Sequence, residues 1–167
     1  MPSNRSLYLL VVLACVLLML IALYMEHVMG LEPCPLCMLQ RGAFIAVGIV
    51  ALLAALHNPA GKLGSRIYAV ITLILAVIGA GLASRQLWLQ SLPADQVPAC
   101  GPSVDYLLEV FPLFDVLLIA IQGTGDCAKV SWTFLGLSIP GWTLIAFVGV
   151  ILIMVLIVLR RPLAAYR

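Results

Sequence analysis

Four stretches of the sequence are apolar for long enough to cross a lipid bilayer. They lie at about residues 7–25, 37–56, 67–88 and 142–159. A spanning helix needs roughly 20 predominantly apolar residues. The hydrocarbon core offers no water to backbone N–H and C=O groups, so each such segment must satisfy them internally as a helix. The sequence therefore predicts an all-α membrane protein: a bundle of four transmembrane helices that forms one integral membrane domain over residues 1–167.

Composition supports this reading and excludes several other classes. The chain is 64% hydrophobic and only 10% charged, whereas a soluble domain carries about 25% charged residues. No GxGxxG fingerprint, Walker loop or basic run indicates nucleotide or nucleic-acid binding. The first apolar stretch is longer than the 7–15-residue core of a signal peptide, and no A-x-A site follows it, so we expect it to be a retained helix.

The charged residues predict how the helices are oriented. Six of the nine cations lie in the first residues, between the second and third apolar stretches, and at the C-terminus: Arg5, Lys62, Arg66, Arg160, Arg161 and Arg167. All seven acids lie on the opposite side: Glu26, Glu32, Asp95, Asp105, Glu109, Asp115 and Asp126. Cytoplasmic loops carry the excess of Lys and Arg. We therefore expect cytoplasmic termini and two periplasmic loops, at about residues 26–41 and 86–141.

The longer periplasmic loop contains an apolar segment that does not fit a fifth span. Its sequence, "VDYLLEVFPLFDVLLIAI", is interrupted by acids at 105, 109 and 115 and by Pro112. A fifth span would also place the C-terminal arginines outside. We predict a helix lying in the membrane interface over residues 105–121, with an ordinary packed loop as the alternative.

Four of the five cysteines map to the predicted periplasmic side. Cys34 and Cys37 lie in the first loop, Cys100 and Cys127 in the second, and Cys15 in the middle of the first helix. A free cysteine in a helix behaves as a small hydrophobe, so Cys15 is predicted to be structural. The periplasm is oxidising and permits disulfides. A structural disulfide framework, a zinc site and a redox site are therefore the competing interpretations of the other four.

The spacing of the first pair favours redox chemistry. A CxxC disulfide closes a very small ring and removes little chain entropy, and its common use is thiol–disulfide exchange. A helix is predicted to begin near Cys37, and its N-terminal dipole favours a thiolate there. Arg41 is one turn further on. Its guanidinium either supports that anion or extends to the lipid headgroups.

The second pair leaves two readings open. Cys100 lies in the turn-rich "VPACGP" and Cys127 in "GTGDCAKVSW". A bond between them would close a loop of nearly thirty residues and add about 2–4 kcal/mol of stability as a static staple. A disulfide in a mobile loop would equally suit attack by the thiolate of a partner protein. Zinc is less favoured because its cysteines usually come as two tight CxxC knuckles.

Taken together, these motifs resemble a known family. The run "EPCPLCMLQR", the second pair "PAC…GDC" and the "FLGLSIPGW" that leads into the last helix are similar to DsbB. That family comprises bacterial inner-membrane, multi-pass protein-disulfide:quinone oxidoreductases. They reoxidise the periplasmic thioredoxin-fold protein DsbA. The likeness extends over nearly the whole chain.

The resemblance implies a role for each site residue. Cys34 and Cys37 would be the quinone-coupled pair, with Cys37 as the thiolate that contacts the ring of ubiquinone or menaquinone. Arg41 would stabilise that complex. Cys100 would accept the attack of the DsbA thiolate, and Cys127 would be its partner and could exchange with Cys34. No metal is implied.

One position departs from the family pattern. Some members carry a histidine late in the third helix, where this chain has Gln86 beside Arg85. The other histidines do not replace it, because His57 is predicted to be cytoplasmic and His27 interfacial. Two alternative functions remain open. One is a DsbB-like paralogue that serves a dedicated thiol partner, and the other is a small membrane transporter with structural disulfides.

Overall fold

The computed structural model describes residues 3–59, 62–93, 95–101, 106 and 109–159. Four long helices make up the bundle: α1 (Asn4–His27), α2 (Pro35–His57), α3 (Lys62–Gln90) and α7 (Ile139–Leu159). Each is long and apolar enough to cross a membrane, which confirms the predicted fold class. Between α3 and α7 lie α5 (Leu113–Gln122), the single turn α6 (Gly125–Ala128), and strands β1 (Thr133–Phe134) and β2 (Leu137–Ser138).

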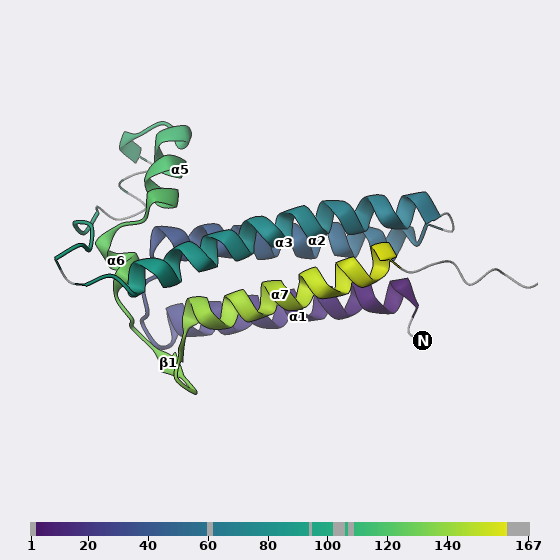
Figure 1. The fold of residues 1–167 in the computed structure, drawn as a ribbon, viewed down its shortest axis with the longest axis horizontal. Coiled ribbons are helices and arrows are strands. Elements are labelled where there is room, and N and C mark those ends of the chain that lie inside the picture. The colour runs from purple at the N-terminus through teal and green to yellow at the C-terminus, as the bar shows by residue number, and fades with distance from the viewer. Residues whose placement is uncertain (1–2, 60–61, 94, 102–105, 107–108, 160–167) are drawn as a thin grey trace, which may run out of the picture.

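The four long helices lie side by side, and the loop elements gather at one end of them (Figure 1). The N-terminus lies at the other end, with the α2–α3 connection. Helix α3 packs on both α2 and α7, and α2 also packs on α1. The predicted acidic and basic connections are therefore at opposite ends of the bundle. Which end faces the periplasm stays a prediction.

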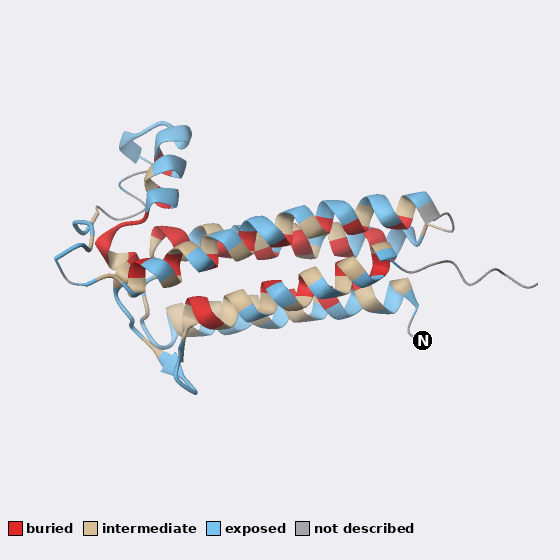
Figure 2. Ribbon diagram, in the orientation of Figure 1, coloured by how far each residue is buried: buried red, intermediate tan, exposed pale blue. Residues whose placement is uncertain are grey.

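Small side chains allow the helices to approach closely. Six buried alanines lie along α2 and α3: Ala51, Ala54, Ala55, Ala69, Ala76 and Ala83. Helix contacts in membranes depend on such small residues, because packing rather than the hydrophobic effect holds the helices together. Larger side chains also fill the interior, and the rings of Phe44 and Phe147 stack there with centroids 4.0 Å apart. The sides of the helices that face away from the bundle are exposed (Figure 2), and they carry many large apolar residues.

All four long helices begin earlier than the sequence predicts, including α1 at Asn4 and α3 at Lys62, and in two of them a proline lies at the new start. Helix α2 starts at Pro35 instead of Cys37, and α7 starts at Ile139 instead of Trp142. In both cases a proline lies in the first turn of the helix. The N–H groups of this turn have no intrahelical acceptor, so the missing N–H of proline costs no hydrogen bond. The proline therefore lies inside the helix rather than marking its boundary.

The loop region contains a hairpin that the sequence analysis did not predict. Strands β1 and β2 pair antiparallel, with Phe134 opposite Leu137. The two residues between them, Leu135 and Gly136, have φ of 52° and 79°, the pattern of a two-residue type I′ turn. The Trp142 indole N–H donates to the Phe134 carbonyl at 3.1 Å and fixes the hairpin to the start of α7.

The described part of the predicted interfacial segment 105–121 is not one continuous helix, because the backbone leaves the helical conformation at Phe111 and Pro112. Helix α5 begins at Leu113, after Pro112 at its N-cap, and ends at Gln122; Asp105 lies outside the described residues. Only Val116 and Ala120 of α5 are buried, so its remaining apolar surface has no partner within the described chain. The Arg85 guanidinium donates to the Gln122 carbonyl at 3.1 Å and attaches the end of α5 to α3. Whether α5 lies in the membrane plane stays a prediction.

The packing of Gly79 leads to a stability prediction. A Cβ at this position would overlap the Phe147 ring, which is already stacked on Phe44. We expect Gly79→Ala to destabilise the protein by about 1–3 kcal/mol, the usual cost of overpacking. The measurement is thermal unfolding in detergent, followed by circular dichroism.

Gly81 provides the matched control on the same helix. A Cβ there would meet nothing within 4 Å, so Gly81→Ala should be neutral or stabilising by roughly 0.5–1 kcal/mol through helix propensity. A Gly79→Ala protein that unfolds no earlier than Gly81→Ala would contradict the packing described here.

Candidate active site

The CxxC pair lies at the first turn of α2. Cys34 is the N-cap residue, and its Sγ accepts the Cys37 backbone N–H at 3.4 Å. The two sulfurs are 3.0 Å apart, with the Cys34 thiol donating to Cys37. A cap side chain normally satisfies one of the free N–H groups of a helix; here a sulfur does so. The predicted position of Cys37 at a helix N-terminus is therefore present in the structure.

Cys127 is the third sulfur of the site. It lies in α6, is fully buried, and packs with Leu36, Leu89 and Cys34. The close approach of α6 to α2 and α3 depends on Gly123, which has a φ of 81° and whose Cβ would meet Leu36 and Leu89. A left-handed backbone of this kind favours glycine. The "GTG" sequence is thus the connection between α5 and α6 that places Cys127 beside the CxxC pair.

The three sulfurs differ in how readily they ionise. The Cys34 thiol donates to Cys127 and Cys37, and these bonds, with burial, raise the pKa of Cys34 far above its usual range. The hydrogen bond from Cys34 lowers the pKa of Cys127 to about 6, assisted by N–H groups of Leu36 and Thr124. Hydrogen bonds to the charged form of a group favour that form. Cys34 is therefore the thiol that holds its proton, and Cys127 is the one that ionises more readily.

Cys100 is at the surface, next to the buried part of the site. It is exposed, and its thiol donates to the Asp126 carboxylate. Lys129 pairs with Asp126 at 2.9 Å, and this contact is the main reason why the pKa of Asp126 is lowered. The Gly125 N–H donates to the Ala99 carbonyl at 3.1 Å and joins the Cys100 segment to α6. All five cysteines are thiols in the structure, so the Cys100–Cys127 pairing stays a prediction.

A buried glutamine contacts both sulfurs of the CxxC pair. Gln86 on α3 is 3% exposed. Its Nε2 donates to Cys34 Sγ at 3.3 Å and to Cys37 Sγ at 3.2 Å, and its Oε1 lies 3.5 Å from Cys37 Sγ. Gln40 donates to the same Oε1 at 2.7 Å. The residue that departs from the family pattern therefore belongs to the site.

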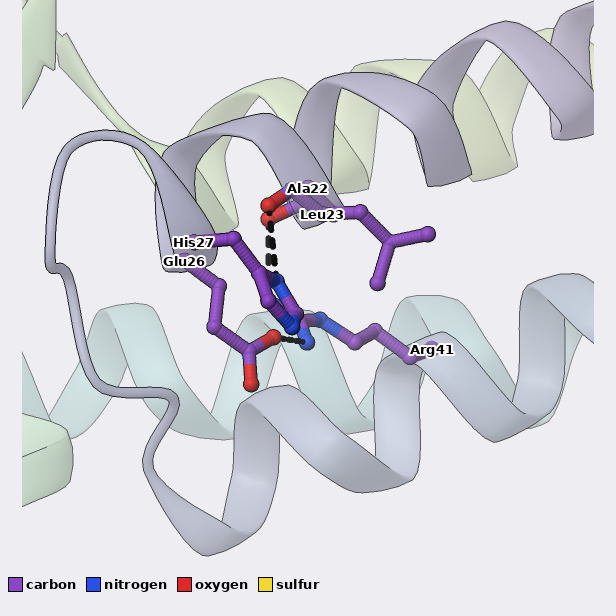
Figure 3. A network of polar contacts seen from close by, with 5 residues as sticks. All are labelled: Ala22, Leu23, Glu26, His27 and Arg41. Atoms are coloured by element: carbon purple, nitrogen blue, oxygen red, sulfur yellow. Dashed lines mark hydrogen bonds and ion pairs between the residues drawn. The ribbon is translucent and has the colours of Figure 1, made fainter.

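Arg41 has a different partner from the one expected. Its guanidinium pairs with the Glu26 carboxylate and donates to the Ala22 carbonyl at 3.2 Å, both at the end of α1 (Figure 3). No hydrogen bond between Arg41 and Cys37 is present among the described residues. His27, one residue after Glu26, is exposed and its Nδ1 lies 3.1 Å from the Leu23 carbonyl. Arg41 therefore joins α1 to α2 instead of contacting the thiol.

A cavity of about 470 Å³ opens beside the CxxC pair. Its mainly apolar wall comes from α1, α2, the hairpin and α7, and its polar residues include Cys37, Gln40, Arg41, Gln86 and Thr143. This volume lies within the roughly 300–1,000 Å³ that is typical of small-molecule sites. The described residues contain no group of three His, Cys, Asp or Glu side chains arranged to hold a metal ion. The cavity could therefore receive an apolar molecule next to a reactive sulfur.

Comparison with known proteins decides the family. The family model for disulfide bond formation protein DsbB matches residues 4–157. The chain belongs to the DsbB family. Disulfide bond formation protein B of Marinobacter nauticus is 58% identical over 159 residues, covering 95% of this chain and 94% of the relative. That of Hahella chejuensis is 56% identical over 160 residues, covering 96% of each.

A third DsbB relative is similar over the same length of the chain. Disulfide bond formation protein B 1 of Pseudomonas aeruginosa is 49% identical over 161 residues, covering 96% of this chain and 98% of its own. Family membership confirms the resemblance drawn from the cysteine motifs. It implies an oxidoreductase that acts in disulfide bond formation, and the four candidate spans make it a multi-pass membrane protein. It also favours this class over the transporter alternative.

Some residues of the site were not identified from the sequence. Gln40 and Thr143 line the cavity, and Thr143 donates to Gln40 Oε1 at 2.6 Å. Gln40 gave a usable signal, because a glutamine one turn after Cys37 lies on the same helix face. Thr143 gave none, because only the tertiary packing of α7 brings it to α2.

The contact between Cys34 and Cys127 leads to a prediction about pH. In the reduced protein, Cys127 should be a thiolate above about pH 6 and a thiol below it. Cys34→Ala removes the strongest donor to that anion, so the pKa of Cys127 should move up towards its ordinary value of 9.0. The measurement is ultraviolet thiolate absorbance across a pH series, in protein that also carries Cys37→Ala.

Cys127→Ala in the same background supplies the blank, because it removes the titrating sulfur. An unchanged midpoint in Cys34→Ala would show that Cys34 does not donate to Cys127.

Proposed function

We propose that this chain reoxidises a DsbA-like thioredoxin-fold protein of the periplasm and transfers the electrons to a membrane quinone. Ubiquinone is the expected acceptor, with menaquinone as the alternative. The enzyme would be a protein-disulfide:quinone oxidoreductase of the bacterial inner membrane, with its active site facing the periplasm. The observation that carries the proposal is the position of Cys34, which contacts both Cys37 and Cys127 beside an apolar cavity.

The first exchange takes place at the exposed sulfur. In the oxidised enzyme, the partner thiolate attacks Cys100 Sγ of a Cys100–Cys127 disulfide, and Cys127 leaves as the thiolate. The second partner thiol then attacks the mixed disulfide, which releases Cys100 and leaves the partner oxidised. Cys100 is exposed and Cys127 is buried, so the partner reaches Cys100. A leaving thiol of low pKa departs faster, and the backbone N–H groups of Leu36 and Thr124 that donate to Cys127 favour its anion.

The second exchange moves the electrons to the CxxC pair. Cys127 Sγ attacks Cys34 Sγ of the Cys34–Cys37 disulfide, and the bond breaks with its electron pair on Cys37. Cys100 then attacks Cys127, which restores the Cys100–Cys127 disulfide and releases Cys34. The net result is one disulfide formed in the loop and one dithiol formed at α2. The packing of Cys34 with Cys127 brings the reacting sulfurs together.

The cavity fits a quinone as the final acceptor. Its apolar wall would bind the ring and the start of the isoprenoid tail, with Arg41 and Cys37 as the residues that hold the polar edge. A bound quinone supplies a two-electron, two-proton acceptor that dissolves in lipid. Cys37 lies on the wall of the cavity at the first turn of a candidate span. A soluble donor and a lipid-soluble acceptor can therefore both reach the site.

The redox energetics explain why such an acceptor is needed. DsbA has a reduction potential near −120 mV, whereas structural disulfides lie below about −300 mV. The dithiol form of an ordinary cysteine pair would thus reduce oxidised DsbA, with a gap of about 180 mV or roughly 8 kcal/mol for two electrons. Stabilising the anionic form of a dithiol makes its disulfide more oxidising. The contacts around Cys37 and Cys127 reduce the difference in reduction potential from DsbA. Electron transfer to the quinone pool supplies the rest of the driving force.

The role of Cys37 can be tested under anaerobic conditions. Purified protein is mixed with a reduced DsbA-like partner and a short-chain ubiquinone analogue, and quinone absorbance is followed. The unmodified protein should reduce the quinone, and Cys37→Ser should lose this activity because no sulfur is left at the cavity wall. Cys15→Ser is the control, since Cys15 lies in the α1 core, and it should keep full turnover. Full turnover of Cys37→Ser would exclude the scheme.

The predicted orientation can be tested by labelling. A membrane-impermeant maleimide added to spheroplasts after mild reduction should modify Cys100, because that thiol is exposed and predicted to be periplasmic. Inverted membrane vesicles should not be labelled. The reverse pattern would place the site on the cytoplasmic side and exclude a periplasmic partner.

A further inference from the structure

A chain of three polar side chains leads from α7 to the sulfurs. The Thr143 hydroxyl donates to Gln40 Oε1 at 2.6 Å, Gln40 Nε2 donates to Gln86 Oε1 at 2.7 Å, and Gln86 Nε2 donates to the sulfurs of the CxxC pair. Both glutamines are 3% exposed. Each link joins a different helix pair, α7 to α2 and then α2 to α3.

The hydrogen bonds of this network run in one direction, from donor to acceptor, and this direction fixes the orientation of the Gln86 amide. An amide offers donors at one end and an acceptor at the other, so either end could face the sulfurs. The Thr143 hydroxyl lies 2.6 Å from Gln40 Oε1 and 3.0 Å from the Pro140 carbonyl, and its single proton goes to the nearer acceptor. This hydrogen bond turns Gln40 Nε2 towards Gln86. Gln86 must then present Oε1 to Gln40, and its Nε2 is left to face Cys34 and Cys37. No buried side-chain N or O atom among the described residues lacks a hydrogen-bond partner.

The donor end of Gln86 meets the sulfur that becomes negative in the proposed exchange. When Cys127 attacks Cys34, the Cys34–Cys37 bond breaks and its electron pair passes to Cys37, without any proton transfer. Gln86 Nε2 lies 3.2 Å from that sulfur. The Arg41 guanidinium is occupied by Glu26 and the Ala22 carbonyl. The Gln86 side chain is therefore the donor placed at the new anion.

We propose that Gln86 is a catalytic residue whose amide N–H stabilises the Cys37 anion, and that Gln40 and Thr143 are positioning residues that hold the amide in this orientation. The inference rests on the proposed function for the identity of the reacting pair. The contact itself is a property of the reduced protein and needs neither partner nor quinone. A neutral donor also avoids the desolvation penalty of a buried charge.

The test measures the reduction potential of the Cys34–Cys37 pair in the absence of quinone. Protein carrying Cys100→Ala and Cys127→Ala is equilibrated with glutathione redox buffers, and the oxidised fraction is counted by thiol alkylation. Stabilisation of the anion favours the dithiol. Gln86→Leu should therefore lower the equilibrium constant for reduction by about tenfold, the size expected for one hydrogen bond to a charged acceptor. That factor corresponds to about 30 mV for a two-electron couple.

Variants at Thr143 separate positioning from packing. Thr143 does not touch either sulfur, so a change there acts only through Gln40 and Gln86. Thr143→Val keeps the shape of the side chain but removes the hydroxyl. The Gln40 amide can then flip, so that it no longer donates to Gln86 Oε1, and the Gln86 amide is free to flip as well. We expect Thr143→Val to shift the potential in the same direction as Gln86→Leu. Thr143→Ser restores the hydroxyl and should restore the potential. Equal potentials in the Val and Ser variants, or no shift in Gln86→Leu, would overturn the inference.

Quinone turnover of the unmodified protein keeps the two proposals distinguishable. If the variants shift the reduction potential as described but the unmodified protein does not reduce quinone, the Gln86 contact is supported and the proposed acceptor is rejected. Normal quinone turnover without the shifts would reject the role of Gln86 and leave the proposed function intact. Thermal unfolding of each variant confirms that the bundle is folded.

Discussion

The contact of α6 with the start of α2 and the end of α3 determines what this site can do. Leu36 and Leu89 bury Cys127 completely, and a glycine with a left-handed backbone allows the turn to approach them. Cys127 and Cys34, the two sulfurs of the proposed internal exchange, then pack against one another although they are far apart in the sequence. Thiol–disulfide exchange requires direct access of one sulfur to another. This packing supplies that access, with Cys127 buried and Cys34 and Cys37 partly exposed.

Two kinds of polar interaction surround the sulfurs, and each suits its location. The ion pair of Arg41 with Glu26 lies at the rim, where both side chains are partly exposed, and it joins α1 to α2. The interior uses the neutral chain from Thr143 to Gln86, in which every member is hydrogen-bonded. Buried networks contribute to structure only when every group is satisfied. The arrangement provides donors at the sulfurs without burying an unpaired charge.

Much of the architecture follows from the sequence, and the exceptions have identifiable causes. The four helices were predictable because lipid imposes both their length and their hydrogen bonding. The N-terminal position of Cys37 followed from the prolines around it. The partners of Arg41 and Gln86 did not follow, because Glu26 and Gln40 reach them only after the helices pack in a particular register. The hairpin was missed because its two-residue strands are too short to give a periodic signal.

The unequal exposure of Cys100 and Cys127 has a further consequence. Exchange proceeds by attack on an accessible sulfur. In the proposed loop disulfide, only Cys100 could be approached from water, since Cys127 is enclosed by α2 and α3. Small thiols that diffuse through the envelope would therefore be limited to one entry point, crowded by Asp126 and Lys129. In the proposed scheme, the burial of Cys127 would therefore direct the first exchange to Cys100, where a protein partner can form further contacts that a small thiol cannot.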